Sequence, residues 1–205
     1  PATGCVNNVV KQIQVNPVTN VDFIVANSQT NRKDSNGEFA FDVCPNQGYV
    51  VLSPNTVPKL GESADFTAVT ITGQTPLDIR FDGTNYSFNT DGVPPGSYII
   101  QYNFTNIYNA TTFKPRTINI LGAPVAKFGV LNRCIDTKIQ YQDSSFVQPS
   151  PFPDSVVNWT WDFGPSQGID FSRNPLHPYP AAAVYQTALK VTTALNCSNT
   201  ILKPV

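Results

Sequence analysis

Short stretches of alternating apolar and polar residues follow one another along the chain. In residues 38–43, Phe39, Phe41 and Val43 fall on one face of an extended segment. A period of two residues is typical of a β-strand with one buried face. Residues 180–185 alone have a helical composition, and they are too few to nucleate a helix. Further strands are predicted in 9–15, 48–53, 64–73, 77–83, 97–105 and 116–121.

The predicted strands are separated by turn residues and lie about 8 to 15 residues apart, which is the rhythm of a β-sandwich. Two breaks look alike, one at 15–23 and one at 121–128, each with a strand, a proline and a short apolar run. The sequence therefore predicts a terminal strand of a preceding unit in 1–19, one sandwich in 20–121 and another in 123–205. Short proline-containing linkers restrict interdomain motion.

Composition narrows the class of protein. Charged residues make up 13% of the 205 positions and the net charge is −1, which argues against a nucleic-acid partner. No apolar run is long enough to predict membrane insertion. The sequence contains no methionine, so we expect a processed form or an internal piece of a longer protein. Four cysteines, without a CxxC pair, permit disulfides in three pairings and favour a secreted or surface location.

The last segment carries the strongest pattern. In 156–163 the residues Val157, Trp159, Trp161 and Phe163 alternate with polar residues, and in 185–191 every second residue is again suited to a core. Five short motifs then occur in order. This segment resembles the PKD domain, an Ig-like sandwich, and the matching positions are Trp159, Trp161, Asp162, Phe163, Gly164, Ser172, Asn174, Pro175, His177, Tyr179, Tyr185, Leu189, Val191 and Cys197.

The resemblance implies an all-β protein of tandem Ig-like/PKD β-sandwich domains. It also implies a disulfide between Cys134 and Cys197, because cysteines flank the first and last strands in one variant of the family. Cys5 and Cys44 would then form a second pair. The arrangement is similar to the large repetitive surface adhesins of gliding Bacteroidetes that the type IX secretion system exports.

Candidate chemistry is sparse. His177 is the single histidine, and no G-x-S-x-G motif is present, so we predict no catalytic residues and no enzyme activity. Asp143, Asp154, Asp162 and Asp170 are the carboxylates considered for a paired site. The GDG turn of the family is replaced by GPSQG at 164–168. Asp162 and Asp170 are weak candidates for a calcium ion, in a segment for which no cofactor is otherwise expected.

Two surface features complete the expectations. Ser155, in the sequence DSV, matches an O-glycan acceptor pattern implied by the same resemblance. Clustered tyrosines in the middle domain either stack on sugar rings or are buried in the core, and these are Tyr49, Tyr86, Tyr98, Tyr102 and Tyr108. The N-x-S/T triplets at Asn85, Asn103, Asn109, Asn158 and Asn196 are ascribed to the Asn/Thr-rich composition.

The sequence thus predicts a non-catalytic repeat segment of a cell-surface adhesin filament, acting as a rigid spacer and adhesion surface in gliding or attachment. Its expected partners are neighbouring repeats of the same chain and a surface polysaccharide or substratum. The alternative is an accessory PKD or carbohydrate-binding module of a secreted polysaccharide hydrolase or protease. Binding of this segment to insoluble glycans would favour that alternative.

Overall fold

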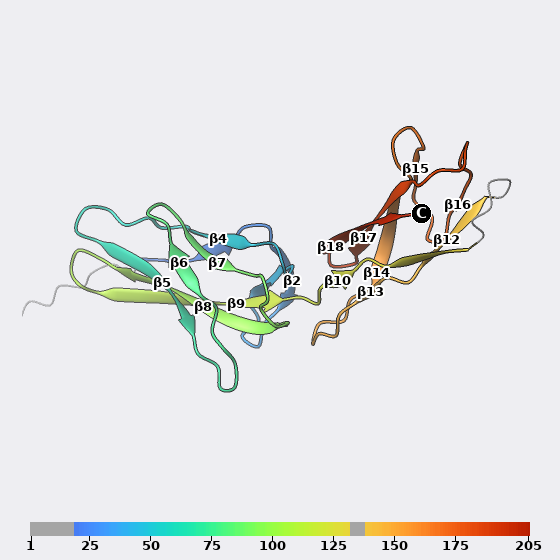
Figure 1. The fold of residues 1–205 in the computed structure, drawn as a ribbon. Coiled ribbons are helices and arrows are strands. Elements are labelled where there is room, and N and C mark those ends of the chain that lie inside the picture. The colour runs from blue at the N-terminus through green and yellow to red at the C-terminus, as the bar shows by residue number, and fades with distance from the viewer. Residues whose placement is uncertain (1–18, 132–137) are drawn as a thin grey trace, which may run out of the picture.

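The computed structural model describes residues 19–131 and 138–205, and every regular element within them is a β-strand (Figure 1). The predicted strand 9–15 and the cysteines Cys5 and Cys134 lie outside the described residues. Two groups of strands lie end to end, joined by the linker 121–123 (Figure 1). No helix in the described residues is long and apolar enough to cross a membrane.

The first group builds a sandwich of two sheets. Its strands are β1 (Phe23–Val25), β2 (Gln29–Lys33), β3 (Phe39–Val43), β4 (Tyr49–Pro54), β5 (Ser63–Val69), β6 (Ile79–Phe81), β7 (Tyr86–Asn89), β8 (Gly96–Thr105) and β9 (Thr111–Ile120). One sheet has the order β1-β4-β7-β6, and the other has the order β2-β3-β9-β8-β5. All neighbours are antiparallel except β3 and β9, which run parallel. The first sheet has the order ABED of an Ig-like sandwich and β5, β8 and β9 form CFG, so the fold is Ig-like.

The core of this sandwich follows the alternation in its longest strand. Tyr98, Ile100, Tyr102 and Phe104 of β8 point inward, and the residues between them point outward. Phe66 packs edge-on against Phe23 at a centroid distance of 5.0 Å, which links the two sheets. Each such aromatic buries a large apolar area, so this cluster stabilises the domain.

Strand β3 departs from its predicted alternation. Phe41 and Val43 are buried as expected, but Phe39 is half exposed at the start of the strand. Ala40 and Asp42 point to the opposite face and are buried as well. On this face Asp42 contacts Asn119 and Arg32, which both belong to the first sandwich.

The second group builds a smaller sandwich. Its strands are β10 (Pro124–Val125), β11 (Phe128–Leu131), β12 (Ile139–Asp143), β13 (Phe146–Val147), β14 (Val156–Asp162), β15 (Ile169–Asp170), β16 (Leu176–His177), β17 (Gln186–Thr193) and β18 (Ser198–Pro204). The sheet β15-β14-β17-β18 faces the sheet β11-β12-β16, while β10 pairs with β13. The core comprises Ala126, Phe128, Tyr141, Trp161, Phe163, Leu189 and Val191.

A β-bulge in β14 changes one predicted core position. The register with β17 shifts between Val156, opposite Thr193, and Asn158, opposite Thr192, so that Val157 is the extra residue. Val157 is therefore exposed, and Val156 packs against the core in its place. An inserted residue of this kind turns a side chain to the other face of the strand. The alternation predicted for Trp161, Phe163 and the strand β17 is observed.

Candidate functional site at the junction between the sandwiches

The linker between the two sandwiches is buried and hydrogen-bonded on both sides. The amide of Leu121 donates to the carbonyl of Val43 in the first sandwich, at 3.0 Å. The amide of Gln148 in the second sandwich donates to the carbonyl of Ala123, at 2.9 Å. Leu121 is only 1% exposed. A linker whose backbone is paired on each side has little freedom to bend.

Gly122 lies where the backbone of the second sandwich approaches the linker. A Cβ atom built on Gly122 would stand 2.5 Å from the carbonyl oxygen of Gln148 and 3.0 Å from Cγ1 of Val147. No side chain fits at such distances, so glycine is required here by close approach. The contact presses the loop after β13 against the linker.

A disulfide joins the two sandwiches beside this linker. Cys44, directly after β3, is bonded to Cys197, in the turn between β17 and β18. Both sulfurs lie in a buried apolar cluster with Leu121, against which Phe152 and Leu195 pack. Residues separated by 153 positions are thereby fixed to each other, with a Cα–Cα distance of 5.4 Å.

This bond corrects the predicted pairings. Cys44 and Cys197 are bonded to each other. The predicted pairs Cys134–Cys197 and Cys5–Cys44 are therefore both wrong.

Polar contacts flank the disulfide. The guanidinium of Arg32 in β2 lies 5.0 Å from the ring centroid of Phe152 in the second sandwich. Nε2 of Gln29 donates to the carbonyl of Leu195 at 3.1 Å. Cation–π and hydrogen-bond contacts of this kind each add a modest stabilisation to the covalent link. Both contacts cross the junction from the first sandwich to the second.

Arg32 also compensates a buried charge at the junction. The carboxylate of Asp42 is 1% exposed, and its Oδ1 accepts a hydrogen bond from Nδ2 of Asn119 at 2.8 Å. Its Oδ2 lies 3.7 Å from Nε of Arg32. A buried carboxylate requires such a partner. Arg32 therefore contacts Asp42 in the first sandwich and Phe152 in the second.

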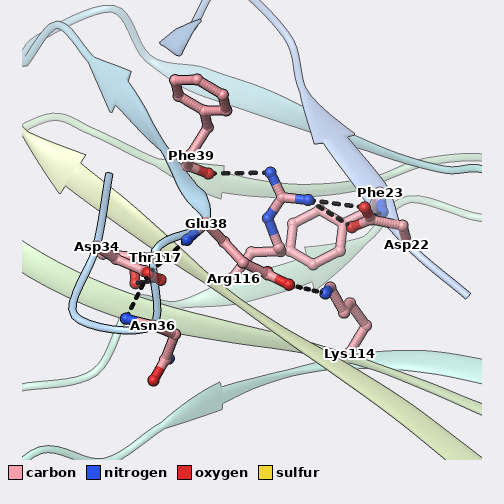
Figure 2. Close-up of polar contacts among 9 residues, drawn as sticks. All are labelled: Asp22, Phe23, Asp34, Asn36, Glu38, Phe39, Lys114, Arg116 and Thr117. Carbon is pink, nitrogen blue, oxygen red and sulfur yellow. Dashed lines mark hydrogen bonds and ion pairs between the residues drawn. The ribbon is translucent and has the colours of Figure 1, made fainter. Parts of the chain in front are cut away.

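A second polar cluster, centred on Arg116, connects the two sheets of the first sandwich (Figure 2). Arg116 of β9 donates from Nη1 to both carboxylate oxygens of Asp22, at 2.8 and 2.7 Å, and from Nη2 to the carbonyl of Phe39 at 3.0 Å. Asp22 precedes β1 in one sheet, whereas Phe39 begins β3 in the other. Arg116 thus ties the two sheets together, and Lys114 beside it pairs with Glu38.

The PKD-like motif residues converge on the core of the second sandwich. Nε1 of Trp161 donates to the carbonyl of Ser172 at 2.9 Å. Oδ1 of Asn174 accepts from the amide of Asp143 at 2.8 Å, and the carbonyl of Pro175 accepts from the amide of Tyr141 at 2.9 Å. These contacts fasten the segment 171–175 to the two sheets.

Aromatic stacking continues through the remaining motif residues. His177 stacks on Phe163 at 3.9 Å, and Tyr179 stacks on Tyr185 at 3.9 Å. Burial lowers the pKa of His177, and the nearby Asp170 carboxylate partly opposes that shift. Tyr179 shares a hydrogen-bonded group with Tyr141 and Thr187, and burial raises the pKa of Tyr141. These residues are placed to stabilise the domain.

The two carboxylates considered for calcium are not brought together. Asp162 is opposite Ile169 and Asp170 is opposite Trp161, so the two side chains point to opposite faces of the sheet. Oδ1 of Asp162 accepts from the amide of Gly164, and Oδ1 of Asp170 accepts from the amide of Ser172. Each carboxylate therefore holds a turn. In the described part of the chain, no group of three or more His, Cys, Asp or Glu could hold a metal ion.

The tyrosines of the first sandwich divide between core and surface. Tyr98 and Tyr102 are buried, whereas Tyr49 and Tyr108 are half exposed. Tyr86 lines a groove of about 620 Å³ between the two sheets. Burial raises the pKa of both Tyr86 and Tyr102.

Ser155, the predicted O-glycan acceptor, is exposed immediately before β14. It lines a small polar pocket on the junction side of the second sandwich. Its modification stays a prediction. The junction residues Gln29, Arg32 and Phe152 were not predicted from the sequence, because they lie in segments without a periodic pattern.

No protein-family model matches the chain, and no curated protein matches it. Among solved structures, the PKD1 domain of Vibrio anguillarum Epp is 24% identical, with a TM-score of 0.37, covering 42% of this chain and 93% of that one. A Bacteroides ovatus mixed-linkage glucan utilization locus protein, SGBP-B in complex with a mixed-linkage heptasaccharide, is 10% identical, with a TM-score of 0.30. The match covers 90% of this chain and 70% of that one. At these TM-scores neither likeness carries an argument about function.

Proposed function

We propose that this chain is a non-catalytic connecting segment of a secreted or cell-surface protein, in which two Ig-like sandwiches are held as one stiff unit. The observation that carries the proposal is the Cys44–Cys197 bond across the junction. Disulfides persist in oxidising compartments, which supports a location outside the cytoplasm. The prediction of a rigid spacer in a surface adhesin agrees with this arrangement.

Three features of the junction support rigidity rather than mere connection. The linker is buried and paired on both sides, the close approach at Gly122 excludes any side chain, and a disulfide closes the remaining side. A covalent bond beside a short linker leaves no single hinge about which the sandwiches could rotate. An extended spacer transmits position and force along its length only if such hinges are absent.

Domain alignment in solution tests this proposal. Residual dipolar couplings of both sandwiches should fit one common alignment tensor in the oxidised protein. In the Cys44→Ser/Cys197→Ser variant the two sandwiches should fit tensors of different magnitude, because the covalent tie is lost. Cys134→Ser serves as the matched control and should leave the common tensor intact. Two independent tensors in the oxidised wild-type protein would overturn the proposal.

The nature of the parent protein is a separate matter. We propose a large surface adhesin, of the gliding and type IX secreted kind that the repeat style resembles, and the alternative is a secreted hydrolase or protease with this segment as a module. An antibody against this segment distinguishes the two in fractionated cells. A surface-attached polypeptide of several hundred kilodaltons supports the adhesin, whereas a smaller soluble band in the medium supports the secreted enzyme.

A further inference from the structure

Two loops of the first sandwich project from the end that lies away from the second sandwich (Figure 1). They are residues 55–62, between β4 and β5, and residues 106–110, between β8 and β9. Both emerge at one end of the sheet, because Ser63 pairs with Thr105 and Thr105 pairs with Thr111. The other end of β9 leads into the linker to the second sandwich.

Large apolar side chains of these two loops point into solvent. Four of them are more than half exposed and form what is here named the upstream end face: Val57, Leu60, Ile107 and Tyr108. The loops touch each other, since a Cβ atom built on Gly61 would lie 3.4 Å from Cγ2 of Ile107. Single exposed apolar residues are common, whereas a group of them on adjoining loops marks a contact surface.

The second sandwich provides an internal comparison, because its strands correspond to those of the first. Strands β14, β17 and β18 pair in the same order and direction as β5, β8 and β9. Likewise, β12 lies between β11 and β16 as β4 lies between β1 and β7. The loops 55–62 and 106–110 therefore correspond to the segments 144–155 and 194–197.

In the second sandwich the corresponding segments are covered. Phe152 of one segment and Leu195 of the other pack against the buried cluster of Cys44, Leu121 and Cys197. Leu121 belongs to the linker that enters this sandwich. The entering chain thus takes part in covering the two segments.

The chain enters the first sandwich beside the upstream end face. The carbonyl of Asn20 accepts a hydrogen bond from Oγ1 of Thr56 at 3.3 Å, and the carbonyl of Asp22 accepts one from the amide of Asn55 at 2.9 Å. The residues that precede Thr19 are therefore attached next to the loop that carries Val57 and Leu60.

The two entering segments also match in sequence. Phe23 and Phe128 hold equivalent positions, because each is paired with the last residue of the next strand, β4 or β12. A proline stands before each phenylalanine, and a large apolar residue stands shortly before each proline, Leu121 in one segment and Val15 in the other. Val18 follows the proline of the first segment.

We propose that residues 1–18 of this chain pack on the upstream end face, with Val15 and Val18 against Leu60 and Ile107, as Leu121 packs at the junction between the sandwiches. Removal of these apolar side chains from water drives the contact. Attachment at Thr19 holds the segment beside the face at a high effective concentration, which favours it over a second copy or a separate partner. The inference does not depend on the disulfide bond that carries the proposed function.

Contacts between methyl groups test the proposal on the full chain of 205 residues. In a nuclear Overhauser spectrum of methyl-labelled protein, Val15 or Val18 should show cross-peaks to the methyl groups of Leu60 or Ile107. A spectrum with no cross-peak between residues 1–18 and the upstream end face would overturn the proposal.

A variant of the face provides the first control on specificity. Leu60→Ser/Ile107→Ser alters two exposed side chains, so both sandwiches should stay folded, and unchanged peaks of the second sandwich verify this. The Val15 methyl peaks should lose these contacts and move to the positions of an unstructured peptide. Tyr49→Ser is the matched control, because Tyr49 is half exposed at the opposite end of β4. Equal Val15 peak positions in both variants would contradict the proposal.

A variant of the segment provides the reciprocal test and leaves the described sandwiches unaltered. In Val15→Ser/Val18→Ser, the amide peaks of residues 106–110 should shift, whereas Val9→Ser, further along the segment, should leave them in place. Unchanged amide peaks of 106–110 in the double variant would count against the proposal.

An equal mixture of ¹³C-labelled and unlabelled chains identifies the molecule that occupies the face. Contacts within one chain give no cross-peaks in an isotope-filtered spectrum of this mixture, which is the expected result. Cross-peaks between labelled and unlabelled chains at Leu60 or Ile107 would assign the face to a second copy and overturn the proposal.

Discussion

Cys44 and Cys197 are bonded to each other although they belong to different sandwiches and stand 153 positions apart in the sequence. Cys44 directly follows β3, and Cys197 directly precedes β18. A tension applied at Thr19 and Val205 therefore passes through β1 to β3, the sulfur atoms and β18. The strands β4 to β17 lie outside this covalent path.

Stretching experiments should register this bypass. In the oxidised protein, pulling from both ends should never extend the chain between the two cysteines. After reduction, or in Cys44→Ser, the total contour length should rise by about 550 Å, since 153 residue spacings extend by about 3.6 Å each. Single-molecule force spectroscopy with and without reductant measures the difference. Equal contour lengths in the two conditions would show that the bond is absent in solution.

Gly122→Ala should loosen the junction without unfolding either sandwich. The added Cβ would meet the Gln148 carbonyl oxygen at 2.5 Å, so the loop after β13 must move away from the linker. We expect a cost of about 1–3 kcal/mol in thermal or urea unfolding. Gly129→Ala is the matched control, because nothing lies within 4 Å of its Cβ and its stability should change by less than about 1 kcal/mol. An equal effect of both substitutions would contradict this account of Gly122.

Much of the fold was predictable because strand alternation is a local property of the sequence. Every second residue from Tyr98 to Phe104 in β8 is buried, as are Trp161 in β14 and Phe163 directly after it, where a period of two residues puts them. The exceptions have non-local causes. Val157 is displaced by a bulge that depends on its partner strand, and Asp42 is buried beside Asn119 of β9 and Arg32 of β2.

The junction was much less predictable. The PKD-like motif implied a disulfide within one sandwich, whereas Cys197 is bonded to a residue of the preceding one. The pairing depends on where β3 ends relative to the turn before β18, and no residue pattern encodes that distance. The contact between Arg32 and Phe152 was unpredictable for the same reason, because the two residues belong to separate domains.

Arg116→Met should destabilise the first sandwich by about 1–3 kcal/mol. The substitution removes the two-pronged contact with Asp22 and the hydrogen bond to the carbonyl of Phe39, which together tie the two sheets (Figure 2). Lys114→Met is the matched control, because its pair with Glu38 is more exposed and should be worth at most about 1 kcal/mol. Urea unfolding followed by tyrosine fluorescence measures both, and a larger loss for Lys114→Met would contradict the role assigned to Arg116.

The stability of the second sandwich should fall as the pH drops from 7.5 toward 5. Burial against Phe163 lowers the pKa of His177 below its unfolded value of about 6.5, although Asp170 partly opposes the shift. The unfolded chain then binds a proton more readily than the folded one, so the stabilisation is present above pH 6.5 and is lost as the pH falls through that value. The lowered pKa of Asp170 affects stability only near and below pH 4, outside this window.

His177→Phe keeps a ring on Phe163 and removes the titrating group. Urea unfolding of both proteins, followed by tryptophan fluorescence, should show the slope in the wild type and a flat profile in the variant. A slope of the same size in His177→Phe would assign the effect to another group.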